Sequence, residues 1–355
     1  MNMSRFTPYF GIAAGLLCGI FIFVLFNRVA PVTTVVPGVV NPVSSATTST
    51  KAIAPAERAS SKVVSTTTPA SAPAAPSGRS VALTAAGSAL IDALVNIICY
   101  APAGSGLHSI SASGVFIDPK GIILTNAHVA QYFLIADKGV SCIIRSGTPA
   151  VDRYDASLIY ISPTWLKKNP SVLTETLPNG TGEYDFAFLA VSDSSTTNPL
   201  PSSFPSVSLA TLSPLSNTPI VIASYGAQFL DPSQIVSTLF PTMVFGSVKD
   251  VFTFNTNTID VLSLGGSAIA QEGSSGGGVS NTEGELVGIV TTSTVSGAVS
   301  TRSLSAITSS YIRAEYASEA GQPLSSLLVR RPSFSIANFA PQIPVLEAII
   351  TAQLP

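Results

Sequence analysis

The sequence predicts an all-β fold of two six-stranded antiparallel barrels with a C-terminal helix, preceded by one N-terminal transmembrane helix and a disordered linker. Charged residues make up only 10% of the 355 residues, and Ala, Ser, Thr and Val dominate, which disfavours a helical bundle. Short apolar segments separated by Gly, Pro and Asp fill the middle of the chain, as antiparallel barrels require. A long uncharged apolar run lies near the start.

The N-terminal segment is predicted to cross a membrane. Residues 1–8 form a short tail, and residues 9–26 read YFGIAAGLLCGIFIFVLF, with no charge between Arg5 and Arg28. At a rise of about 1.5 Å per residue, such a helix just spans the hydrocarbon core. The length of the run and Pro31 beyond it favour an uncleaved signal anchor, with a cleaved signal peptide as the alternative. The bulk of the chain is expected outside the cytoplasm, because long translocated domains override local charge bias.

Residues 27–82 are predicted to be a flexible linker. They consist almost entirely of Pro, Ser, Thr, Ala and Val, contain no aromatic residue and show no sustained hydrophobic period. Such a segment cannot bury enough apolar surface to offset its ordering entropy, and its prolines keep it extended.

The globular part is predicted to span residues 83–322 and opens with a helical pattern over 83–94. The first group of expected strands is 95–100, 111–118, 121–127, 140–145, 155–162 and 185–191. The second group is 219–225, 243–251, 259–264, 276–281 and 285–292. A helix over 305–319 is expected to follow, with Ser305 as its N-cap and Gly321 at its end. The tail, 323–355, is expected to hold one short helix over 341–353, either docked or free.

Three short motifs carry the candidate chemistry: TNAHV around His128, YDFAFLAV around Asp185, and GSSGGGV around Ser275. A serine hydroxyl is a poor nucleophile unless an imidazole takes its proton and a carboxylate orients that imidazole. The only other histidine, His108, lies in a loop-like segment without a motif. Asp185 opens an apolar strand that would fix its carboxylate near the imidazole. The rival carboxylates, one in a turn and the others without such a strand, are Asp118, Asp137, Asp152 and Asp155.

Glycines on both sides of Ser275 would let the backbone turn sharply and bring N–H groups close to a reacting carbonyl. The backbone N–H groups of Gly273 and Ser275 are therefore the expected oxyanion-hole donors. An imidazole must be neutral to act as the base, so activity should rise between about pH 6 and pH 8.

The segments SGVFIDPKGIILTNAHV (113–129), DFAFLAV (185–191) and EGSSGGGVSNTEGELVGIVTT (272–292) resemble the chymotrypsin- and trypsin-like serine proteases. Within them, the chain is most similar to the bacterial HtrA/Deg-type protease domain without its PDZ modules. The resemblance covers residues 85 to 300 or so and implies a serine endopeptidase. Together with the predicted anchor over 9–26, it leads us to expect a membrane-anchored protease in a bacterial-type cell envelope. The spacing between His128 and Asp185 is long for that family, which predicts an extra loop over 162–182.

The resemblance also implies a primary substrate pocket, formed by Ile269, Ala270, Thr291, Thr292 and Ser293. Because no acidic residue occupies position 269, small or medium apolar substrate side chains are expected rather than basic ones. In the resembling fold the strands of Cys99 and Cys142 are neighbours, so a disulfide between them is expected outside the cytoplasm, with two buried thiols as the alternative.

Composition excludes several other classes. A net charge of −2 without a basic run argues against nucleic acid, and two histidines with three scattered cysteines cannot form an ordinary zinc cluster. No cofactor is expected, and the expected partners are protein or peptide substrates and the membrane. Two other functions stay open: a catalytically silent pseudoprotease or chaperone-like binder on the same fold, and a stalked adhesin in which the barrels are only a scaffold.

Overall fold

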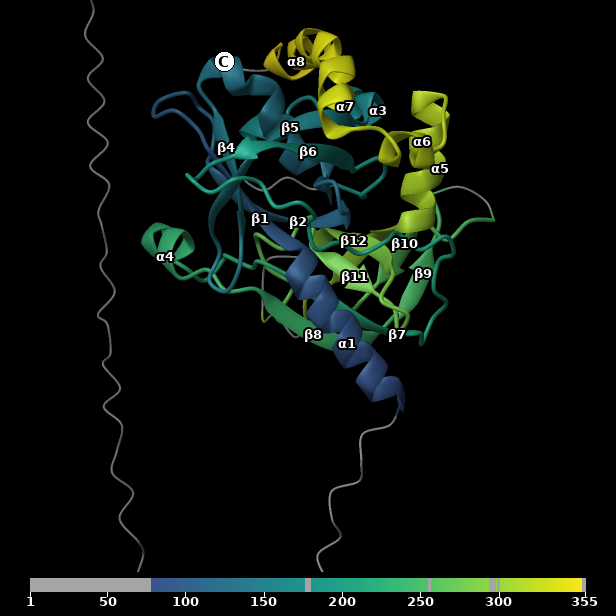
Figure 1. Ribbon diagram of the computed structural model, residues 1–355. Coiled ribbons are helices and arrows are strands. Elements are labelled where there is room, and N and C mark those ends of the chain that lie inside the picture. The colour runs from purple at the N-terminus through teal and green to yellow at the C-terminus, as the bar shows by residue number, and fades with distance from the viewer. Residues whose placement is uncertain (1–77, 176–179, 255–256, 294–297, 299–300, 353–355) are drawn as a thin grey trace, which may run out of the picture. The chain divides into compact units, whose positions relative to one another are not determined.

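The computed structural model describes residues 78–175, 180–254, 257–293, 298 and 301–352 (Figure 1). The predicted transmembrane helix, 9–26, and the linker up to residue 77 lie outside the described residues. Helix α1 (Gly78–Ala93) begins five residues before the predicted start at 83, so residues 78–82 are helical and the linker boundary at 82 is corrected. Helix α1 contacts both halves of the domain, because its fully buried Leu90 lies on the side that faces β2, β7 and β11.

The first half is a closed antiparallel barrel of six strands, as predicted, in the order β1-β2-β3-β6-β5-β4. Its strands are β1 (Leu94–Tyr100), β2 (Ile110–Asp118), β3 (Ile122–Thr125), β4 (Ser141–Ser146), β5 (Val151–Ile161) and β6 (Ala187–Ser194). Strand β3 is shorter than expected, because the chain turns into helix α2 (Ala127–Ala130) and the 3-10 helix η1 (Gln131–Lys138). The extra loop between β5 and β6 contains α3 (Pro163–Lys168) and η2 (Val172–Thr174).

The second half is a seven-stranded antiparallel sheet in the order β8-β7-β11-β12-β13-β10-β9. Its strands are β7 (Pro219–Ser224), β8 (Thr242–Ser247), β9 (Asp250–Phe252), β10 (Val261–Ser263), β11 (Gly278–Ser280), β12 (Leu286–Ser293) and β13 (Leu304–Thr308), with α4 (Pro232–Ser237) between β7 and β8. The all-β class with two antiparallel halves is confirmed, but the second half has seven strands rather than the predicted six. The expected strand over 243–251 is divided into β8, which pairs with β7, and β9, which pairs with β10. The partner changes between Val248, whose N donates to Thr218 O, and Lys249, whose N donates to Ser263 O.

The helix predicted over 305–319 begins later than expected. Residues 304–308 form β13, in which Ile307 pairs with Ile289 of β12 and with Val261 of β10. Helix α5 (Ser309–Ala320) starts only after Thr308, whose hydroxyl accepts a hydrogen bond from Tyr311 N at 3.1 Å. The helix ends at Gly321 as predicted, with a left-handed φ of 66°.

The tail is docked and contains more helices than the single one expected over 341–353. It forms α6 (Leu324–Leu328), α7 (Pro332–Phe339), the 3-10 turn η4 (Ala340–Gln342) and α8 (Ile343–Thr351). Helix α7 packs on β5 and β6, and α8 packs on η1 and α3 (Figure 1). An ion pair of 3.1 Å between Lys138 Nζ of η1 and Glu347 Oε1 of α8 joins the tail to the segment that follows α2.

Among the described residues, one helical stretch, Pro332–Thr351, is long and apolar enough by composition to cross a membrane. It comprises α7, η4 and α8, with Pro341 near the start of η4 and Pro344 near the start of α8.

Candidate active site

His128 lies just after the end of β3, a strand of the first barrel. Asn126 is the N-cap of the short helix α2, and its amide Nδ2 donates to the backbone carbonyl of Asp185 at 2.9 Å. The imidazole that follows is partly exposed, with 24% of the side-chain surface accessible. The backbone carbonyl of His128 accepts from Gln131 Nε2 at 2.9 Å. The backbone that carries the imidazole is therefore fixed by hydrogen bonds, while the ring itself is partly exposed and can meet a ligand.

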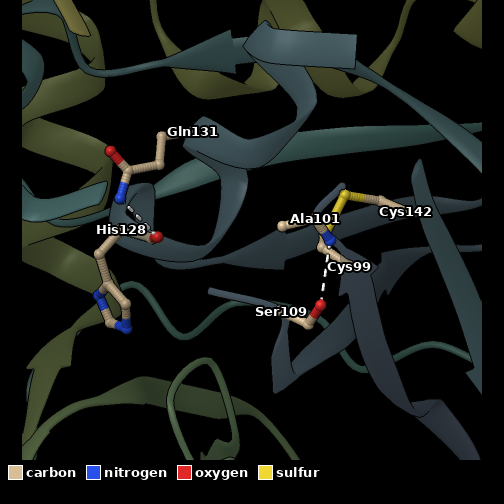
Figure 2. Close-up of a disulfide and its surroundings, with 6 residues drawn as sticks. All are labelled: Cys99, Ala101, Ser109, His128, Gln131 and Cys142. Atoms are coloured by element: carbon tan, nitrogen blue, oxygen red, sulfur yellow. Dashed lines mark hydrogen bonds between the residues drawn. A yellow bond between two sulfur atoms is a disulfide. The ribbon is translucent and has the colours of Figure 1, made fainter. Parts of the chain in front are cut away.

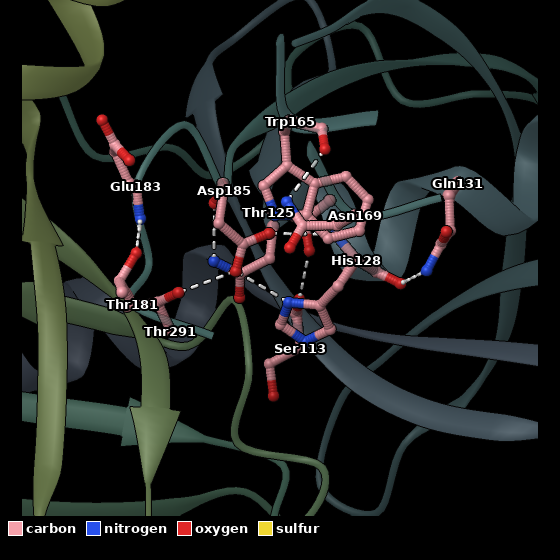
Figure 3. Close-up of polar contacts among 11 residues, drawn as sticks. Ser113, Thr125, His128, Gln131, Trp165, Asn169, Thr181, Glu183, Asp185 and Thr291 are labelled. Carbon is pink, nitrogen blue, oxygen red and sulfur yellow. Dashed lines mark hydrogen bonds and ion pairs between the residues drawn. The ribbon is translucent and has the colours of Figure 1, made fainter. Parts of the chain in front are cut away.

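Asp185 precedes β6, and its carboxylate is buried against His128 (Figure 3). Its Oδ2 accepts from His128 Nδ1 at 2.8 Å and from Thr291 Oγ1 at 2.7 Å, and its Oδ1 accepts from His128 N at 2.9 Å. An ionised carboxylate can only accept, so Nδ1 carries the proton and Nε2 is left as the basic nitrogen. The arrangement provides an oriented base.

Ser275 lies in a turn that is fixed between both halves of the domain. Its carbonyl accepts from Ser113 N of β2, and the next amide, Gly276 N, donates to Val290 of β12, both at 2.8 Å. Gly276 has a φ of 80°, and a Cβ at this position would lie 2.0 Å from Ser113 O and 2.6 Å from Thr125 Oγ1. The turn thus contacts two strands of the site. One is β3, whose end leads to His128, and the other is β12, which carries Thr291.

No hydrogen bond among the described residues joins Ser275 Oγ to His128. Ser275 is partly exposed, so its hydroxyl is accessible from solvent. Catalytic hydrogen bonds in unliganded enzymes are often long and tighten only when substrate binds. The structure therefore places His128 and Asp185 together, and links Ser275 to them through Ser113 and Thr125.

The turn before Ser275 exposes two backbone N–H groups. Ala227 N donates to Glu272 O at 2.8 Å. In a trans peptide the N–H and C=O point in opposite directions, so this bond also fixes the direction of the N–H of Gly273, which shares the peptide with Glu272 O. Ser113 Oγ donates to Gly273 O at 2.8 Å and so holds the following peptide. Neither Gly273 N nor Ser275 N donates to any acceptor within the described part of the chain. Two free donors on one turn suit a developing oxyanion.

Sequence reasoning missed two residues of this site, Asn126 and Ser113, and gave a third, Thr291, a different role. Asn126 had a signal, because it stands inside the TNAHV motif, and Ser113 stands in the segment that carried the family resemblance. Thr291 was expected to line the substrate pocket, yet its hydroxyl binds Asp185. No local pattern marks that role, since the two residues lie 106 positions apart.

Two of the residues expected to form the primary pocket, Ile269 and Ala270, lie inside the second half. The side chains of Ile269 and Ala270 are fully buried, and both belong to the core of the second half. Thr292 and Ser293 lie in β12 as expected, but their side chains are outside the described part of the structure. The substrate-binding role of these residues stays a prediction. A cavity of about 280 Å³ lies elsewhere, between the first barrel and α5, α6 and α7.

Cys99 and Cys142 form a disulfide in the first barrel (Figure 2). They occupy directly opposite positions on the paired strands β1 and β4, where cross-strand side chains approach each other closely. The bond closes a loop between residues 43 positions apart. Next to it, Ala101 N donates to Ser109 Oγ at 3.0 Å.

A closed antiparallel barrel, a second antiparallel sheet and a histidine–aspartate pair beside a glycine-rich serine turn define a trypsin-like peptidase domain. Residues 112–289 match the family model described as the trypsin-like peptidase domain. The match covers half of the sequence, and the chain belongs to this family. The resemblance to trypsin-like proteases found in the sequence is thereby confirmed.

The chain is similar to solved structures of the Rv3671c protease. An alanine mutant from M. tuberculosis H37Rv in an inactive form has 16% identity and a TM-score of 0.42, over 70% of this chain and 96% of that one. Another inactive form has 16% identity and a TM-score of 0.42, over 67% of this chain and 94% of that one. The active form from M. tuberculosis has 17% identity and a TM-score of 0.42, over 67% and 84%. No curated protein matches the chain.

Proposed function

We propose that this trypsin-like peptidase is a membrane-anchored serine endopeptidase that acts outside the cytoplasm through Ser275, His128 and Asp185. The observation that carries the proposal is the His128–Asp185 pair, in which both carboxylate oxygens are bound by His128 and Nε2 is left as the base. Unfolded or regulatory proteins of the cell envelope are the proposed substrates. Residues 9–26 would supply the anchor.

In the acylation step, His128 Nε2 takes the proton of Ser275 Oγ as this oxygen attacks the carbonyl carbon of the scissile peptide bond. The electron pair of the carbonyl moves to its oxygen, which accepts hydrogen bonds from Gly273 N and Ser275 N. Asp185 stabilises the imidazolium through Nδ1–H. The intermediate then collapses, the C–N bond breaks, and the leaving amine takes the proton from His128.

In the deacylation step, water enters where the amine left. His128 removes one proton from this water as its oxygen attacks the ester carbon, and the same two N–H groups bind the second oxyanion. Collapse returns the proton to Ser275 Oγ and releases the carboxylic acid. Each of the two oxyanion donors is worth about 3 kcal/mol of transition-state stabilisation.

The proposal is tested by casein digestion with the full chain in detergent, wild type beside Ser275→Ala. The wild type should cleave casein, and Ser275→Ala should be inactive because it lacks the nucleophile. Equal digestion by both proteins would contradict it, because the activity would then come from another source.

A pseudoprotease or binding protein is the second candidate function. Two observations favour it: within the described residues Ser275 Oγ has no hydrogen bond to His128, and the side chains of Ile269 and Ala270 are buried rather than open to substrate. A pseudoprotease would bind unfolded casein without turnover. It would also fail to react with a serine-directed fluorophosphonate, which separates the two functions.

A further inference from the structure

The backbone just before Asp185 adopts an unusual conformation. Tyr184 has a φ of 59°, in the left-handed region that bulky L-residues rarely adopt. Phe186 N donates to Tyr184 O at 2.8 Å and Asp185 N donates to Gly182 O at 3.1 Å, so the chain reverses sharply around Asp185. The direction of the Asp185 carboxylate therefore depends on Tyr184 keeping this conformation.

A hydrogen bond from the second half of the domain holds this turn. Tyr184 N donates to Tyr311 Oη at 3.0 Å. Tyr311 is 3% exposed and lies in the first turn of α5, directly after β13, so a sheet strand and a helix together fix its position. Its ring packs against Phe254, with 5.1 Å between the centroids. Burial raises the pKa of Tyr311, so its hydroxyl stays protonated and neutral at every working pH.

The contacts that the side chains of Tyr184 and its neighbour Glu183 make with Lys168 are weaker. Lys168 Nζ lies 4.7 Å from the centre of the Tyr184 ring and 3.1 Å from Glu183 Oε2. About half of the Lys168 side chain is exposed, so solvent screens both interactions. The bond to Tyr311 is buried on the acceptor side, and an N–H left without its partner there would be costly. It therefore adds a buried hydrogen bond from outside the turn to the two backbone bonds within it.

We propose that Tyr311 is a positioning residue for Asp185: its hydroxyl holds Tyr184 in the left-handed conformation and so keeps the carboxylate directed at His128. This inference rests on the proposed function. It identifies Tyr311, in the second half of the domain, as a residue that acts through Asp185 on His128, the catalytic base in the first half. Tyr311 touches neither substrate nor reacting atoms.

The test uses the full chain with a peptide substrate and compares Tyr311→Phe with Tyr316→Phe. Tyr316 lies in the same helix and is equally buried, and among the described residues its hydroxyl accepts only from Gln322 Nε2, at 3.4 Å. Tyr311→Phe should lower kcat roughly ten- to hundred-fold while KM stays within about twofold, because the transition state loses alignment but substrate binding does not. Tyr316→Phe should keep the wild-type kcat.

A rescue variant separates positioning from general stability. Asn adopts the left-handed conformation more readily than Tyr, so Tyr184→Asn in the Tyr311→Phe background should recover part of the lost kcat. The inference is overturned if Tyr311→Phe keeps wild-type kcat, if both Phe variants lose activity equally, or if Tyr184→Asn recovers nothing. An inactive wild type would overturn the proposed function together with this inference.

Discussion

The carboxylate of Asp185 is bound twice by His128, through the ring Nδ1 at 2.8 Å and through the backbone N at 2.9 Å. The ring contact sets the tautomer, and the backbone contact prevents the carboxylate from rotating away from the ring. Two contacts from one residue fix both the distance and the direction of the pair. The remaining acceptor position on Oδ2 is filled by Thr291 Oγ1.

Thr291→Val should lower kcat/KM roughly ten- to hundred-fold. Valine has nearly the same shape but removes the donor to Asp185 Oδ2, and a hydrogen bond to a charged group is worth about 1.5–3 kcal/mol. The measurement is steady-state kinetics on a peptide substrate. Thr351→Val in α8, which loses only a bond to Glu347 O, is the matched control and should behave as wild type. Unchanged kinetics of Thr291→Val would show that Asp185 does not depend on it.

Gly276→Ala should abolish activity and lower Tm much more than Gly284→Ala. Both glycines have left-handed φ angles, 80° and 78°, so both alanines carry similar backbone strain. Only at Gly276 would the new Cβ overlap a backbone oxygen, Ser113 O at 2.0 Å, whereas nothing lies within 4 Å at Gly284. Gly284→Ala should lower Tm by only about 2–4 °C, from about 1–2 kcal/mol of strain. Equal Tm losses in a thermal unfolding experiment would contradict the packing at Gly276.

Removal of the Cys99–Cys142 disulfide should destabilise the domain by roughly 4 kcal/mol in the chain-entropy model, because the unfolded chain regains the freedom of a loop between residues 43 apart. The double variant Cys99→Ser/Cys142→Ser should therefore unfold at lower denaturant concentration than the wild type. Thiol titration of denatured, unreduced wild type should detect a single thiol, that of Cys18, among the three cysteines. Three titratable thiols would mean that the bond does not form.

Glu315→Gln should stabilise the protein at neutral pH. Burial, followed by the nearby charges of Glu319, Asp260 and Glu183, raises the pKa of Glu315 above its ordinary value of 4.5, against an opposing effect of Lys168. The folded state thus favours the protonated carboxyl, and this contribution is lost as pH rises through the raised pKa. The Tm gain of the variant should be largest near neutral pH and vanish below the ordinary value.

Thermal unfolding of the wild type and Glu315→Gln, from below pH 4.5 to neutral pH, checks the direction of the Glu315 pKa shift. Glu283→Gln, an exposed change in a turn, is the control and should leave Tm unaltered. A Tm gain for Glu315→Gln that is largest at acid pH would contradict the direction of the shift.

The first barrel could be predicted almost strand by strand, because its segments are short, apolar and separated by turn residues. The boundary between β13 and helix α5 could not be predicted, and the sequence pattern indicated a helix start at residue 305 instead. The residues LSAIT fit the start of a helix as well as a strand, and only pairing of Ile307 with Val261 and Ile289 decides between them. The tail was difficult for the same reason, since its short helices are defined by docking rather than by local sequence: α6 on α5, α7 on β5 and β6, and α8 on η1 and α3.

The candidate site shows the same division. His128, Asp185 and Ser275 stand in local motifs, so their residue types and order could be read from the sequence. The residues that hold the Asp185 turn in place could not be predicted. Thr291 lies 106 positions from its partner Asp185, and Tyr311 lies 127 positions from its partner Tyr184. Such contacts exist only when the two halves of the domain have come together.

The most direct measurement is the mass of the full chain after reaction with a fluorophosphonate, followed by peptide mapping. A serine that His128 activates should be labelled once, on Ser275, with the label absent from Ser275→Ala and strongly reduced in His128→Ala. Labelling at another serine, or none in a folded wild type that retains its disulfide, would contradict the assignment of Ser275 as the nucleophile.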